Sequence, residues 1–156
     1  MVNTKQPKNE VLALARKRHI RAEKDETKLG DDNAVRCGFA VITLSQPQRA
    51  MMTPGVPDRR YRHRAKRLTL WFEWKAEDGQ LTQDQHRFLL AELEAGELAA
   101  CGGLEDFSRV LIALFRAGAT HAESLKTCQQ VVDKWAARGY RPERARRPRR
   151  PRYVRA

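Results

Sequence analysis

The stretch Leu68–Gln85 reads LTLWFEWKAEDGQLTQDQ and decides the fold of this chain. Residues 68–75 have the composition of a β-strand, with apolar side chains on both of its faces. A strand of this kind lies in the middle of a sheet that is covered on both sides. Asp78-Gly79 then predicts a turn, and Thr82 predicts the N-cap of a helix that stops at Gly96.

Apolar periodicity and turn residues divide the rest of the chain into further elements. Three prolines within residues 45–57 predict a shaped loop, because proline cannot donate a hydrogen bond to a sheet. The predicted elements are a helix from Glu10, a loop over 23–34, a strand over 35–44, a short strand over 58–61 with a basic hairpin tip after it, a strand over 97–101, a helix over 104–117 and a helix from Thr120 with a capping box to Glu123.

Charge points to a polyanionic partner. Lys and Arg number 31 against 19 Asp and Glu, for a net charge of +12. The last nineteen residues, from Arg138, hold nine arginines and one glutamate, so most of the excess lies in a Pro- and Arg-rich tail. Such a tail cannot build a core, and we expect it to be disordered and to bind phosphates without reading sequence. Nucleic acid is therefore the first expected partner, ahead of an anionic membrane surface.

The remaining composition predicts a cytoplasmic protein. Three scattered cysteines, without a CxxC pair, favour reduced thiols over disulfides or a structural zinc site. Neither a signal peptide nor an apolar run of about 20 residues is visible, so we expect no membrane association. No phosphate-binding glycine loop or Ser/His/Asp order occurs, and no small-molecule cofactor is expected.

Two acids and a lysine form the candidate catalytic set. Asp58 follows Gly55-Val56-Pro57, and Glu73 and Lys75 are two residues apart at the end of an apolar strand. Phosphodiester hydrolysis needs an activated water and neutralisation of charge on the phosphate, and a divalent metal supplies both. Asp58, Glu73 and the main-chain carbonyl of Trp74 could bind Mg²⁺, with Lys75 reaching the phosphate or the attacking water.

Each part of this set also has a structural explanation. Glu73 and Lys75 could form an ordinary salt bridge, although burying two charges at a strand end is costly without compensation. Gln85 fits a capping box with Thr82. The basic run between the two acids could be a solvated loop, or it could bind nucleic acid through Arg59, Arg60, Arg62, Arg64, Lys66 and Arg67, as the tail could through Arg146, Arg147, Arg149 and Arg150.

Three blocks together resemble a known family. Gly55-Val56-Pro57-Asp58, Phe72-Glu73-Trp74-Lys75 and the helix start from Gly79 to Gln85 are similar to the VRR-NUC domain, the virus-type replication-repair nuclease. This family is a branch of the PD-(D/E)xK nuclease superfamily, whose fold is restriction-endonuclease-like. The resemblance is most specific over residues 53–96.

The resemblance implies an α/β fold with a small mixed central sheet flanked by helices. It places the nuclease domain at 9–118, an extra C-terminal helix at 119–138 and the tail at 139–156. It implies Mg²⁺- or Mn²⁺-dependent cleavage by Asp58, Glu73 and Lys75, with Gln85 near the site. Glu10 would be the acid on the first helix that also binds metal. Some members form homodimers and act on branched DNA such as junctions or flaps.

Two alternatives stay open at the level of sequence. The chain could be a nuclease-fold module that holds nucleic acid without cutting it. It could also be a basic nucleoid- or RNA-associated protein in which the motif is accidental, and then Asp58 and Glu73 would lie far apart. One departure from the family is the basic sequence Arg59-Arg60-Tyr61-Arg62 where an apolar strand is usual, so we expect this strand to be short or at a sheet edge.

Overall fold

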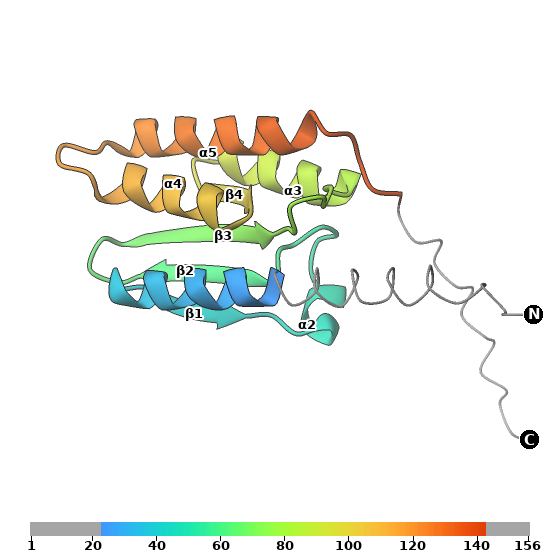
Figure 1. Ribbon diagram of the computed structural model, residues 1–156, viewed down its shortest axis with the longest axis horizontal. Coiled ribbons are helices and arrows are strands. Elements are labelled where there is room, and N and C mark those ends of the chain that lie inside the picture. The colour runs from blue at the N-terminus through green and yellow to red at the C-terminus, as the bar shows by residue number, and fades with distance from the viewer. Residues whose placement is uncertain (1–22, 143–156) are drawn as a thin grey trace, which may run out of the picture.

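A computed structural model describes residues 23–142, which form one mixed sheet with helices on both faces (Figure 1). The strand order is β1-β2-β3-β4. Strand β2 pairs antiparallel with β1 and with β3, whereas β3 and β4 run parallel. In chain order the elements after residue 36 are β1 (Ala40–Thr43), α2 (Gln46–Ala50), β2 (Arg59–His63), β3 (Leu68–Trp74), α3 (Gln83–Glu94), β4 (Leu98–Gly102), α4 (Leu104–Phe115) and α5 (His121–Ala136). The predicted mixed α/β architecture is confirmed.

Strand β3 is an interior strand, as its apolar composition predicts. It pairs with β2 on one side and with β4 on the other. Leu70, Phe72 and Trp74 lie on one face, Trp71 and Glu73 lie on the other, and all five are buried. The burial of Glu73 among these side chains is what makes the end of β3 chemically unusual.

Aromatic contacts hold the helices against the two faces of β3. On one face, Phe107 of α4 packs against Phe72 and Trp74, with ring centroids 4.8 and 5.0 Å apart. On the other face, Phe88 of α3 meets Trp71 edge-on at 5.4 Å. These edge-on and tilted geometries are the ones that aromatic rings prefer. They place the N-terminus of α3 beside the end of β3.

Helix α5 belongs to the core, although the sequence predicts it as an addition to the domain. It packs along β4 and against α3 and α4. Its Cys128, Val131 and Val132 are fully buried. The indole Nε1 of Trp135 donates to Asp106 Oδ2 of α4 at 2.9 Å. None of the helices within residues 23–142 has the length and apolar character of a membrane span.

Residues 23–34 are helical, so the predicted loop is wrong. The helix continues to residue 36. Gly30 suggested a turn, but it lies inside this helix. Glycine is needed there because a Cβ atom would lie 2.2 Å from the Trp74 ring. Asp31 suggested the same turn, but it accepts hydrogen bonds from Tyr61 Oη at 2.6 Å and Arg59 Nε at 3.3 Å. Tertiary contacts therefore explain both residues.

Two neighbouring predictions need smaller corrections. The strand expected over residues 35–44 is confined to β1, because the preceding helix extends to residue 36 and a turn follows it. The proline-rich loop over 45–57 contains the short helix α2. Ser45 caps this helix by accepting a hydrogen bond from the Gln48 amide, with Pro47 in the first turn.

Strand β2 is short, as predicted, but it is interior rather than at an edge. It has five residues and lies between β1 and β3. Tyr61 and His63 point into the core and are buried. Arg60 lies over the Trp71 ring, with its guanidinium carbon 5.1 Å from the ring centroid. An interior strand tolerates Arg59 and Arg60 because their charged ends find acidic or aromatic partners, and Arg62 because its side chain is exposed.

Candidate active site

A pocket of about 680 Å³ opens at the C-terminal end of β3. The arrowhead of β3, the helix α2, the start of the helix over 23–36 and the segment after α5 all lie at this end of the sheet (Figure 1). The ends of parallel strands such as β3 and β4 are common positions for ligand sites in α/β proteins. The residues that line the pocket include Asp58, Glu73, Trp74, Lys75 and Gln85.

Glu73 is the buried centre of this pocket, with 7% of its surface exposed. Its Oε1 accepts hydrogen bonds from Gln85 Nε2 at 2.7 Å and pairs with Lys75 Nζ at 3.2 Å. Its Oε2 is buried and has no hydrogen-bond partner among residues 23–142. A buried carboxylate oxygen without a partner is costly, so a cation is the kind of ligand that this atom lacks.

Burial raises the pKa of Glu73 from its ordinary 4.5 to about 7. Loss of solvation is the largest cause, and the nearby negative charge of Asp58 adds to it. Lys75 and Arg49 act in the opposite direction because their positive charges favour the carboxylate. Burial outweighs both cations, so near neutral pH the carboxylate is poised between binding a proton and binding a metal.

Gln85 connects the catalytic candidates to the start of α3. Its Oε1 accepts from both the Thr82 amide and Lys75 Nζ, each at 2.9 Å, while its Nε2 donates to Glu73. The capping box that the sequence predicts is confirmed. The Gln85 side chain also contacts Glu73 and Lys75. Gln85 therefore caps α3 and lies beside the candidate catalytic residues at the same time.

Asp58 lies in the same pocket, with its side chain 39% exposed. Its main-chain carbonyl accepts a hydrogen bond from the Leu44 amide at 2.9 Å, which fixes the start of β2 against β1. Its carboxylate lies 3.6 Å from Arg59 Nη1. The influence of Asp58 on the pKa of Glu73 reflects their proximity, which the accidental-motif alternative does not predict.

The Gly55 block reaches the site through a close backbone contact. Gly55 has φ +84° and lies so near the first turn of α3 that a side chain would be 2.1 Å from the Asp84 carbonyl oxygen. Glycine is therefore required for both conformation and space. This contact holds the loop before Asp58 against the helix that carries Gln85.

Trp74 contributes to the pocket through the position of its backbone. Its indole points to the opposite face of the sheet, where Nε1 donates to Tyr61 Oη at 2.8 Å. The following residue is held in place because the Lys75 amide donates to the Gly102 carbonyl of β4 at 2.9 Å. The parallel pairing with β4 thus fixes the direction in which the Lys75 side chain leaves the sheet.

Besides Asp78 of the predicted turn, three charged residues line the pocket that the sequence did not single out as site residues. Glu23 lies on the first helical turn that the structure describes, Arg49 lies on α2, and Arg141 follows α5. Arg49 had a weak signal, because the proline-braced loop that contains it leads to Asp58. Glu23 and Arg141 had none, since only the packing of their segments brings them near β3.

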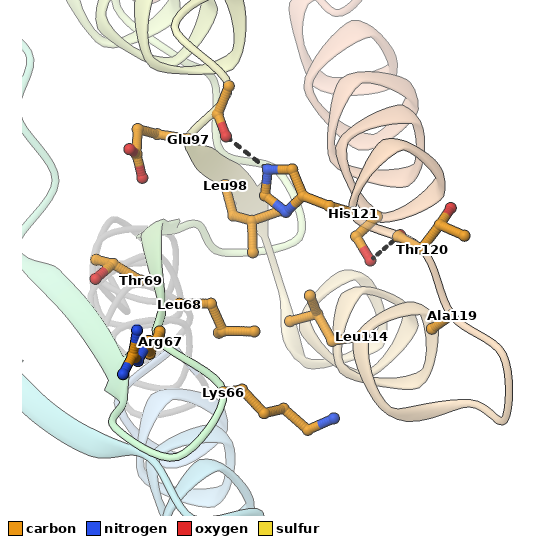
Figure 2. A pocket seen from close by; sticks show the side chains of 12 residues that line it. Lys66, Arg67, Leu68, Thr69, Glu97, Leu98, Leu114, Ala119, Thr120 and His121 are labelled. Carbon is orange, nitrogen blue, oxygen red and sulfur yellow. Dashed lines mark hydrogen bonds between the residues drawn. The ribbon is translucent and has the colours of Figure 1, made fainter.

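The basic hairpin tip lies at the other end of the sheet from the catalytic candidates. Arg64, Lys66 and Arg67 precede β3, whereas Glu73 and Lys75 end it, and a strand of seven residues spans on the order of 20 Å. Lys66 and Arg67 line a separate pocket of about 510 Å³ (Figure 2). Their sequence position between two acids therefore does not bring them to the site.

That second pocket is closed on one side by α5. Figure 2 shows His121 at its wall, where Nε2 lies 2.7 Å from the Gly96 carbonyl. The Lys66 ammonium lies 4.8 Å from the centroid of the half-buried Phe115 ring, which is a cation–π contact. The carboxylate of Glu97 also lines this pocket, so it combines charges of both signs.

The other basic candidates divide between structural and exposed positions. Arg59 pairs with Asp31 and Asp58, and Arg60 stacks on Trp71, whereas the Arg62 side chain is exposed. Binding of nucleic acid by these residues remains a prediction. Glu10 and the tail residues Arg146, Arg147, Arg149 and Arg150 lie outside the described residues.

Within residues 23–142, no group of three or more His, Cys, Asp or Glu side chains is arranged to hold a metal ion. Four acids line the pocket, Glu23, Asp58, Glu73 and Asp78, and two of them, Asp58 and Glu73, belong to the predicted catalytic set. Comparison with protein-family models, with curated proteins and with solved structures finds no match for this chain.

Proposed function

We propose that this chain is a metal-dependent DNA endonuclease of the PD-(D/E)xK type, related to VRR-NUC nucleases. The observation that carries the proposal is Glu73, a buried carboxylate with one oxygen that has no partner within residues 23–142, in a pocket shared with Asp58 and Lys75. Strand pairing and the contact of Gly55 with α3 bring together three blocks that are separated in the sequence.

The donor set fits Mg²⁺ or Mn²⁺. Mg²⁺ binds through one or two carboxylates and keeps several waters, so Asp58 and Glu73 would suffice without a third acid. The Trp74 carbonyl is the proposed additional ligand. When bound, the metal activates a water and neutralises charge that develops on the phosphate.

Lys75 and Gln85 supply the remaining chemistry of the proposed site. The Lys75 ammonium is held by Gln85 Oε1 and Glu73 Oε1, so it enters the pocket as a positioned cation. A cation held in place before the reaction stabilises the developing negative charge of the phosphate better than one that must reorganise. Gln85 is a positioning residue, because it orients both Lys75 and Glu73.

Cleavage of DNA in Mg²⁺ tests the proposal. A panel of junction, flap and linear duplex DNAs should show cleavage that EDTA abolishes and that falls by at least two orders of magnitude in Asp58→Asn and in Lys75→Met. Glu94→Gln, at an exposed position on α3, is the control and should cleave like the unaltered protein. Cleavage that survives both site substitutions would refute the assignment.

Binding without cleavage would support the alternative of a noncatalytic nuclease-fold module. The same panel would decide the proposed preference for branched DNA, which rests on the family resemblance. The homodimer that some family members form is also a proposal, and sedimentation equilibrium of the full chain tests it.

A further inference from the structure

The segment after α5 packs against the turn that precedes α3 and contacts it through several bonds. The carbonyl of Arg138 accepts from Gln80 Nε2 at 2.9 Å, and its guanidinium donates to the Glu77 carbonyl at 2.6 Å. The Arg138 guanidinium carbon also lies 3.8 Å from the centroid of the Trp135 ring. We call residues 138–142 the strap.

The strap continues to the edge of the pocket. Tyr140 Oη lies 2.8 Å from His86 Nδ1, and Leu81 forms a parallel bridge with Tyr140. The Arg141 amide then donates to the Leu81 carbonyl at 2.8 Å. This backbone bond places Arg141 in the pocket wall, on the same pocket as Glu73 and Lys75.

Arg141 has the properties of a phosphate-binding residue. Its side chain is exposed, and it forms no ion pair with any carboxylate among residues 23–142. Arg49 lines the same pocket and likewise forms no ion pair there, and its Nε is buried without a hydrogen-bond partner. Guanidinium groups match phosphate oxygens with two parallel hydrogen bonds, so both cations are suited to bind a phosphate at this pocket.

We propose that Arg141 is a substrate-binding residue that contacts a DNA backbone phosphate next to the scissile phosphate at Lys75. This inference rests on the proposed function and deepens it, because it assigns a substrate contact to a segment outside the part that resembles VRR-NUC. Arg49, on α2, is the partner cation of the same phosphate track.

Binding of DNA in the absence of metal tests the proposal separately from catalysis. Fluorescence anisotropy of a short fluorescein-labelled duplex, in EDTA, compares the full chain with Arg141→Gln. The matched control is Arg36→Gln, which removes the same charge from an exposed arginine on the helix over residues 23–36. Glu23, which lines the pocket, lies on the first described turn of that helix. Arg36 is the last residue of the helix, so it lies at the end away from the pocket.

We expect Arg141→Gln to weaken binding about tenfold and to lower the slope of log affinity against log salt by about 1, as the loss of one phosphate contact does. Arg36→Gln should change affinity less than about twofold, by screening of a distant charge. The strap should stay in place, since Arg141 is fixed through its main-chain amide and the other strap contacts belong to Arg138 and Tyr140. Circular dichroism should therefore give the same melting temperature.

A duplex with one neutral methylphosphonate next to the cleaved bond gives the second readout. The unaltered chain should bind this modified duplex more weakly than the normal duplex. Arg141→Gln should bind the two duplexes equally, because its contact with that phosphate is already lost. Equal affinity loss in both proteins, or equal effects of Arg141→Gln and Arg36→Gln, would overturn the inference. For this arm, the cleaved bond is mapped beforehand with Mg²⁺.

The two proposals can fail independently. A tenfold loss of binding in a chain that never cleaves DNA would retain Arg141 as a phosphate contact while refuting nuclease activity. Mg²⁺-dependent cleavage, with binding unaffected by Arg141→Gln, would retain the nuclease and refute the role of the strap.

Discussion

Replacing Glu73 by glutamine removes a buried negative charge and keeps the size of the side chain. The glutamine carbonyl can take the place of Oε1 and accept from Gln85 and Lys75, which bond that oxygen now. The substitution therefore separates the cost of burying the charge from the cost of disturbing the packing.

The pKa of Glu73 sets the size and sign of the effect. Between the ordinary value of 4.5 and the folded value of about 7, the folded protein binds one more proton than the unfolded chain. The free energy of unfolding therefore falls as pH rises through this window. Each tenfold change in proton affinity is worth about 1.4 kcal/mol, so the loss amounts to roughly 3 kcal/mol above pH 7.

Urea unfolding in EDTA, at about pH 5 and about pH 8, measures this loss. The unaltered chain should lose roughly 3 kcal/mol more than Glu73→Gln across the window. All other titratable groups are the same in both proteins, so their contributions cancel in the comparison. Glu94→Gln, which removes an exposed acid from α3, is the control and should follow the unaltered chain.

Addition of Mg²⁺ at the higher pH extends the test to the metal. Binding to the folded state alone should stabilise the unaltered chain by about 2.7 kcal/mol at 100 times its dissociation constant, and Glu73→Gln by much less. Parallel pH curves for the two proteins would refute the argument that burial makes the Glu73 charge costly. Equal stabilisation of both by Mg²⁺ would refute Glu73 as a metal ligand.

Three further predictions follow from the same contacts. Gly55→Ala should destabilise the fold by roughly 1–3 kcal/mol and reduce cleavage, because the new methyl group meets the Asp84 carbonyl at a positive φ. Urea unfolding and a cleavage assay measure the two effects, and an unchanged urea midpoint would refute the close contact. The Mg²⁺ concentration for half-maximal cleavage should rise about tenfold per pH unit below about 7, where Glu73 takes up a proton; a midpoint independent of pH would exclude this competition. Asp106→Ala should cost roughly 2 kcal/mol by leaving the Trp135 indole unpaired while cleavage at low temperature persists, and loss of activity in a folded variant would place Asp106 in the site.

Much of the framework around β3 was predictable because it depends on local patterns. Apolar residues on both faces of Leu68–Trp74 predict an interior strand, and the structure confirms one. The capping boxes at Thr82 and Thr120 are also confirmed, since a cap involves residues only three positions apart. The proximity of Glu73 to Lys75 follows from strand alternation alone.

The same local reasoning misread Gly30 and Asp31 as a turn. Their roles come from Trp74, Tyr61 and Arg59, which are distant in sequence, and no local rule contains those partners. A glycine that makes room for a neighbouring ring and a glycine that makes a turn are indistinguishable in sequence.

By itself, the sequence determined the strand that carries Glu73 and Lys75, the helix start that carries Gln85 and the concentration of charge near the C-terminus. Only the tertiary structure decided which charges meet. It separated the hairpin tip from the site by the length of β3, and it brought Arg141 to the pocket through a backbone bond to Leu81. The physical reason is that short-range rules set helices and strands, whereas the composition of a pocket depends on how the ends of several elements pack together.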